Sequence, residues 1–129
     1  MKHIIETLIL ISLGGCATSI PQPNRDWLPG EWVMMDGVLQ YPLACGAHGP
    51  ITYEADGTYF LWGEAGAWRL DSNVLTETMT GFEPLHIDRS DADIGKPYVS
   101  TLRWIDRNRF SKRFADGTTS EFRRCPERG

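Results

Sequence analysis

The stretch ITYEADGTYFLW, residues 51–62, places an Asp-Gly dipeptide between two runs of aromatic and β-branched side chains. Asp56-Gly57 is a strong turn pattern, because glycine accepts the positive φ that tight hairpin turns require. We therefore expect a β-hairpin, with one strand over residues 51–54 and its partner over residues 58–62.

Similar short runs, each followed by turn residues, continue on both sides of this hairpin. Residues 31–35, EWVMM, predict a strand that ends at Asp36-Gly37. A second hairpin is expected in residues 66–80, and further strands over residues 98–104, 109–114 and 118–124. No segment of ten residues has a helical stripe. The sequence thus predicts an all-β fold, with seven or eight antiparallel strands in a small closed barrel or sandwich.

The first residues differ in composition from the rest of this 129-residue chain, whose length allows one domain. Lys2 and His3 precede an apolar run over residues 4–13, which Glu6 interrupts. This run is shorter than the roughly 20 residues that span a bilayer, and it has the length of a signal-peptide core. We therefore expect a secretion signal.

The run ends at Leu13-Gly14-Gly15-Cys16, an aliphatic residue and two small ones before a cysteine. This pattern resembles the lipobox of bacterial prolipoproteins. The resemblance implies a signal peptide over residues 1–15 and a lipid thioether on Cys16. The two prolines and the lack of apolar periodicity after Cys16 predict a lipidated, proline-containing tether over residues 16–26 and a domain over residues 27–129. The alternative is an ordinary signal peptide with a chance cysteine.

Two other cysteines, Cys45 and Cys125, remain in the exported part of the chain. An even pair of cysteines in an oxidising compartment predicts a disulfide. The alternative is a metal pair, since Cys45 and His48 have C-x-x-H spacing, but no second pair of ligands lies nearby in the sequence.

Gly30-Glu31-Trp32 opens the first predicted strand, and the last one ends with Arg123-Arg124. Together with residues 55–76, this resembles small bacterial lipocalin-like domains. In lipocalin-like barrels a G-x-W stands at that place, and an arginine of the last strand packs across the indole. The resemblance implies a small antiparallel meander barrel of seven to eight strands, in which Arg124 covers Trp32.

Motifs for catalysis are absent from the sequence, and we predict no catalytic residue, metal or cofactor. Neither G-x-S-x-G nor H-E-x-x-H occurs. His48 and His86 are interpreted as loop residues. Residues 88–95, DRSDADIG, have three aspartates but lack the spacing of a calcium-binding EF-hand, so a solvated acidic loop is the favoured interpretation.

Charge is unevenly distributed along the chain. Residues 26–93 hold twelve acidic and two basic side chains, whereas residues 96–128 hold four acidic and nine basic ones. One interpretation is a basic face for an anionic envelope component such as a lipid headgroup. The favoured interpretation is mutual neutralisation, because the last strands of a closed meander lie beside the first. Nucleic acid is not an expected partner of an exported chain with a net charge of −4.

These observations predict a non-enzymatic, lipid-anchored binding or structural module of the bacterial envelope. Ala17 after the lipidated cysteine implies the outer membrane, facing the periplasm, under the usual sorting rule. A small apolar ligand is expected in the barrel mouth near Trp62 and Trp68. The alternative is an inhibitor of a secreted or periplasmic hydrolase, resembling barrel inhibitors of serralysin-type metalloproteases, with residues 17–32 as the inhibitory arm. The sequence predicts no oligomeric state.

Overall fold

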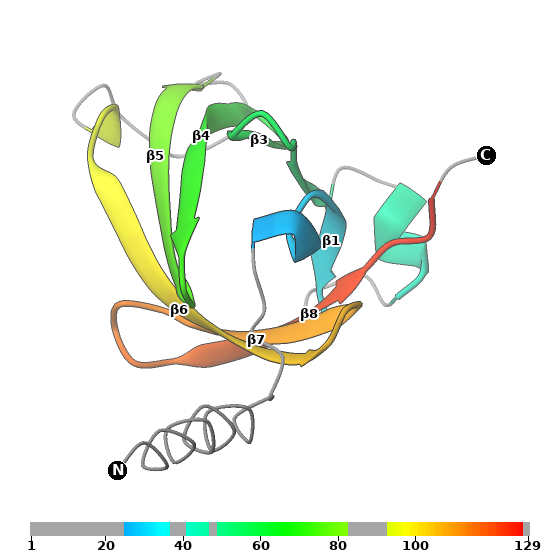
Figure 1. The fold of residues 1–129 in the computed structure, drawn as a ribbon. Coiled ribbons are helices and arrows are strands. Elements are labelled where there is room, and N and C mark those ends of the chain that lie inside the picture. The colour runs from blue at the N-terminus through cyan, green and yellow to red at the C-terminus, as the bar shows by residue number, and fades with distance from the viewer. Residues whose placement is uncertain (1–24, 37–40, 47–48, 83–92, 128–129) are drawn as a thin grey trace, which may run out of the picture.

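The computed structural model describes residues 25–36, 41–46, 49–82 and 93–127. Within them, eight antiparallel strands follow one another in chain order, and β8 pairs with β1 to close a barrel (Figure 1). The strands are β1 (Gly30–Met34), β2 (Ile51–Tyr53), β3 (Thr58–Leu61), β4 (Glu64–Asp71), β5 (Val74–Phe82), β6 (Pro97–Asp106), β7 (Arg109–Arg113) and β8 (Thr119–Arg124). The prediction of an all-β meander barrel is confirmed.

The hairpin of residues 51–62 forms β2 and β3 as expected. At its turn, the backbone N and the Oγ1 of Thr58 both donate to Oδ1 of Asp56, at 3.0 and 2.6 Å. Thr118 makes the same two bonds to Asp116 in the turn before β8. These hydrogen bonds lower the pKa of both exposed carboxyls. The repeated tetrapeptide Ala-Asp-Gly-Thr therefore builds the same turn twice.

The barrel interior holds a cluster of apolar side chains contributed by all eight strands. Alternate residues of each strand point inward, as the period of two requires. The cluster consists of Leu28, Trp32, Ile51, Tyr53, Tyr59, Trp68, Leu70, Leu75, Leu102, Phe110 and Phe122.

The two ends of the barrel differ. A 3-10 helix, η1 (Arg25–Trp27), lies at the end where β1 begins, and Leu28 behind it is fully buried. We call this the helix end; the turns between β2 and β3, β4 and β5, and β6 and β7 lie there too. The opposite end, where β1, β3, β5 and β7 finish, contains the cavity described below, and we call it the cavity end.

A second 3-10 helix, η2 (Leu43–Gly46), lies outside the ring beside the end of β8 (Figure 1). Cys45 in η2 forms a disulfide with Cys125, and both pack with Val33 and Ala44 in a small satellite core. The predicted disulfide is confirmed, and the alternative use of Cys45 as a metal ligand is wrong. Since the bridged cysteines are 80 positions apart, loop entropy predicts about 4–5 kcal/mol of stabilisation.

Candidate functional site

The helix end is closed by a contact between the first and last strands. Trp32 and Arg124 are register partners across the β1–β8 pair. The Arg124 guanidinium lies 4.4 Å from the centre of the Trp32 ring, the geometry of a cation–π contact. The indole is fully buried, and its Nε1 donates to the carbonyl of Leu28 at 2.8 Å. The structure thus brings together the residues that the sequence placed in this motif.

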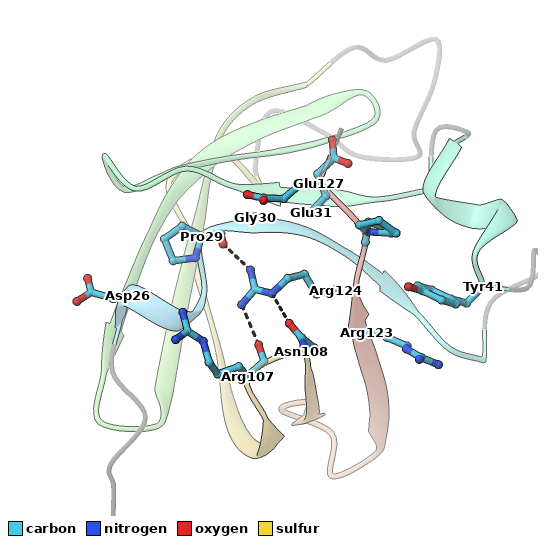
Figure 2. Close-up of a pocket in the computed structure, with 12 residues that line it drawn as sticks. Asp26, Pro29, Gly30, Glu31, Tyr41, Arg107, Asn108, Arg123, Arg124 and Glu127 are labelled. Carbon is cyan, nitrogen blue, oxygen red and sulfur yellow. Dashed lines mark hydrogen bonds between the residues drawn. The ribbon is translucent and has the colours of Figure 1, made fainter. Parts of the chain in front are cut away.

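The same guanidinium also binds the backbone around it (Figure 2). Its Nη1 donates to the carbonyl of Pro29 at 2.8 Å, and Nη2 donates to the carbonyls of Trp27 and Arg107. Its Nε donates to Oδ1 of Asn108 at 3.1 Å. Arg124 therefore connects η1 and the β6–β7 turn to the last strand. Partial burial lowers the pKa of this guanidinium, and the charge of Arg107 adds to the effect.

A groove of about 900 Å³ runs past this cluster, between the helix end and the C-terminal residues Pro126 and Glu127. Figure 2 shows Arg124 in the groove, with hydrogen bonds to the surrounding protein atoms. Four of the five N–H directions of a guanidinium are already used here by protein acceptors. We therefore assign this groove a structural role.

The better candidate site is a cavity of about 280 Å³ at the opposite end, which we call the mouth cavity. Its size falls at the lower limit of typical ligand pockets, so it fits a small molecule. Aromatic and aliphatic side chains make up most of the lining, and four charged side chains complete it. The lining consists of Trp32, Met34, Gly49, Ile51, Tyr59, Leu61, Glu64, Glu77, Met79, Lys96, Tyr98, Lys112 and Phe122.

Two of the charged residues form a buried ion pair inside the barrel. Nζ of Lys112 on β7 lies 3.1 Å from Oε1 of Glu77 on β5, and the side chains are only 6% and 10% exposed. Ser100 on the intervening strand β6 is buried and lies two positions from Tyr98 and Leu102, the register partners of Glu77 and Lys112.

Each member of the pair has a further partner. Oε2 of Glu77 accepts a hydrogen bond from the Tyr53 hydroxyl at 2.6 Å. The Lys112 ammonium lies 5.3 Å from the ring centre of Phe122 and 5.6 Å from that of Phe114. Burial raises the pKa of Tyr53 well above its usual value, and the neighbouring Glu77 charge raises it further. Tyr53 therefore remains a hydrogen-bond donor to Glu77 at neutral pH.

The predicted ligand site at Trp62 and Trp68 does not coincide with the mouth cavity. Trp68 is buried in the core, and its Nε1 donates to the carbonyl of Glu54 at the helix end. Trp62 lies half-exposed in the β3–β4 turn at the cavity end. Trp68 lies inside β4, directly opposite Glu77, whereas Trp62 precedes that strand. Neither lines the mouth cavity.

The sequence contained a pattern that points to the ion pair, although the prediction missed it. Glu77 alternates with Leu75 and Met79, and Lys112 alternates with Phe110 and Phe114. By the period of two, each charge falls on the apolar, inward face of its strand. A charged residue at such a position needs a partner inside the barrel.

Four arginines gather on the outer surface of β6, β7 and β8, a surface that we call the basic face. The register places Arg109 directly opposite Arg123 and Arg103 diagonal to Arg113. Only Arg109 among them forms an ion pair with another described residue, Asp106. The adjoining outward positions of β5 are Val74, Thr76 and Thr78. Mutual neutralisation, the favoured interpretation, describes Glu77 with Lys112, whereas on the basic face Arg109 pairs with Asp106 and the exposed Glu121 lies among the arginines.

Several predicted features lie outside the described residues, namely Cys16, His48, His86 and most of the acidic segment 88–95. Within the described ranges, no group of three or more histidine, cysteine or acidic side chains could hold a metal ion. No helix in the same residues has the length and apolar character to cross a membrane.

No protein-family model, curated protein or solved structure matches this chain. The site is therefore argued from its own geometry.

The Trp32–Arg124 contact generates a prediction for Gly30→Ala. Gly30 has a φ of +138°, and a Cβ atom there would lie 2.6 Å from Nη1 of Arg124. We expect a loss of about 1–3 kcal/mol in unfolding free energy from the backbone strain, with displacement of Arg124 added to it. Denaturant titration measures the change. Gly81→Ala is the matched control, because a Cβ atom there meets nothing within 4 Å. Equal stability of the two variants would contradict the role given to Gly30.

Proposed function

We propose that this protein is a non-enzymatic lipoprotein of the bacterial envelope, whose lipocalin-like barrel binds a small, largely apolar ligand in the mouth cavity. The observation that carries the binding role is the cavity itself, which is about 280 Å³ in volume and lined mainly by apolar side chains. A filled barrel would instead have favoured a structural role.

The lipocalin-like assignment draws support from the order and closure of the strands. Eight strands in meander order and Arg124 over Trp32 agree with what the resemblance implies. The barrel is small, and so is its cavity.

The alternative role as a hydrolase inhibitor is less well supported. It assigns residues 17–32 to an arm that enters an enzyme cleft. Leu28 and Trp32 in this range are fully buried in the barrel core, so they are not available to an enzyme. The rest of the proposed arm, before Arg25, lies outside the described residues.

Ligand binding is tested with N-phenyl-1-naphthylamine, a neutral apolar dye that fluoresces when it leaves water. We expect saturable binding to the wild-type protein. Met79→Trp should weaken it at least tenfold, because Met79 is 2% exposed and lines the cavity, which the larger indole would fill.

The matched control for this variant is Val99→Trp, which adds the same side chain at an exposed position of β6. Melting curves establish that both variants fold, since overpacking costs about 1–3 kcal/mol. Unchanged dye binding by folded Met79→Trp would refute the mouth cavity as the binding site.

Membrane attachment is tested by metabolic labelling with an alkynyl palmitate in a Gram-negative host. The proposal places the acyl chains on Cys16, so the wild type should be labelled and recovered with the outer membrane, whereas Cys16→Ala should lose the label. Equal labelling of the two proteins would exclude Cys16 as the acylated residue.

A second candidate function rests on the basic face. Like charges directly opposite each other on neighbouring strands are destabilising, yet Arg109 faces Arg123. The exposed Val99 and Ile105 lie on the same outer surface of β6 as Arg103. Guanidinium groups interspersed with aliphatic side chains are suited to the headgroup region of an anionic bilayer. We propose that this surface binds anionic phospholipid headgroups.

The basic face predicts selective binding to anionic vesicles. The full chain carrying Cys16→Ala should sediment with vesicles of phosphatidylglycerol and phosphatidylcholine, and not with phosphatidylcholine alone. Each arginine near a membrane surface contributes about 1 kcal/mol, so Arg103→Gln with Arg113→Gln should weaken binding by about 25-fold.

The control is Arg69→Gln, which removes one exposed arginine from β4, on another side of the barrel. It should leave vesicle binding within about twofold of the parent chain. If the control weakens binding as much as the double variant does, the effect reflects net charge and not the basic face.

A further inference from the structure

Glu77 and Lys112, which we call the floor of the mouth cavity, indicate which head group the ligand has, in addition to its apolar character. A buried ion pair seldom adds stability, since well-packed hydrophobic residues of similar volume do as well or better. Glu77 and Lys112 nevertheless lie between apolar residues of their strands and line the mouth cavity. The stability of the barrel therefore does not account for the pair.

The pair still has hydrogen-bonding capacity toward the cavity. A lysine ammonium has three N–H donors, and the one described hydrogen bond of Lys112 goes to Glu77. The two oxygens of Glu77 each accept one described bond, from Tyr53 and from Lys112. Among the buried charged residues of the lining, Lys112 is therefore the one able to donate a hydrogen bond to a ligand; Lys96, which also lines the cavity, is exposed.

The total charge of this floor limits the ligand further. Glu77 and Lys112 together carry no net charge, and both are almost fully buried. A carboxylate beside Lys112 would leave a net negative charge in a space removed from water, and a ligand ammonium beside Glu77 would leave a net positive charge. Uncompensated buried charge is strongly unfavourable. An uncharged carbonyl or amide adds an acceptor for Lys112 without adding charge.

We infer that the mouth cavity selects an uncharged amphiphile, a short alkyl chain with one hydrogen-bond-accepting head group such as a carbonyl or amide, which Lys112 binds while Glu77 neutralises the lysine. This inference rests on the proposed ligand-binding function and names the chemical class of the ligand. The alkyl chain lies against the apolar lining residues Ile51, Met79 and Phe122.

Three probes with the same chain and different heads test the selection. Octanamide, octanoate and octylamine are titrated at pH 7 against wild-type protein loaded with N-phenyl-1-naphthylamine, and displacement of the dye is measured. We expect octanamide to displace the dye at a concentration at least tenfold below that of either charged probe. Displacement by octanoate or octylamine at an equal or lower concentration overturns the inference, and so does the absence of displacement by all three.

Changing the charge of the floor should change the preference. In Glu77→Gln, Lys112 lacks its counter-charge, so the affinity for octanoate should rise at least tenfold relative to that for octanamide. In Lys112→Met, Glu77 lacks its partner, so the affinity for octylamine should rise relative to that for octanamide instead. Glu121→Gln makes the same chemical change at an exposed position of β8 and should keep the wild-type order.

The two proposals fail in different ways. If the dye itself does not bind the wild-type protein, the proposed function is wrong. If the dye binds in the cavity but a charged probe is preferred, the function stands and the inference about the head group is wrong. Should the charge variants not fold, the order of the three probes on the wild-type protein still decides.

Discussion

Closure of the ring between the first and last strands is the constraint on which the rest of this structure depends. Trp32 and Arg124 are partners in that pairing, and their side chains continue the contact into the barrel end. The guanidinium connects three backbone carbonyls, from Trp27, Pro29 and Arg107, to the last strand. One cation thereby holds together η1, the start of β1 and the β6–β7 turn. Without it, the part-buried carbonyls of Trp27 and Pro29 and the exposed carbonyl of Arg107 would lose a charged donor at the same time.

The two ends of the barrel interior are packed differently. Trp32 packs against Phe110 at 4.6 Å and against Trp104 at 5.9 Å between ring centres, which fills the barrel at the helix end. Toward the cavity end, aromatic rings such as Tyr59 and Phe122 line the interior together with Met79 and the Glu77–Lys112 pair, and a cavity remains between them. Stability is thus concentrated at the helix end, and the candidate binding site lies where packing is less complete.

The sequence predicted the fold well because turns and alternation are local properties. Asp56-Gly57 and Asp116-Gly117 marked turns correctly, and strand boundaries differ from the predictions by only one or two residues in most places. The contact of Arg124 with Trp32 was also foreseeable, because both residues lie at chain positions that closure brings together. The candidate site was less predictable, because a cavity depends on how side chains from distant strands meet. Trp62 and Trp68 are close in sequence, yet Trp62 lies half-exposed in the β3–β4 turn, whereas Trp68 is buried in the core.

The placement of the charged residues was also only partly predictable from the sequence. Counting charges along the chain could not distinguish inward from outward positions, although alternation could have done so. Lys112 and Arg113 are neighbours in β7, but one points into the barrel toward Glu77 and the other joins the basic face outside. Inside, a single charge requires its opposite within hydrogen-bonding distance, because water cannot reach it. Outside, water screens the arginines, so the surface tolerates four of them without equal numbers of carboxylates. The two adjacent basic residues therefore meet opposite physical requirements. Lys112 lies inside the barrel at the floor of the mouth cavity, whereas Arg113 lies outside on a surface suited to an anionic partner.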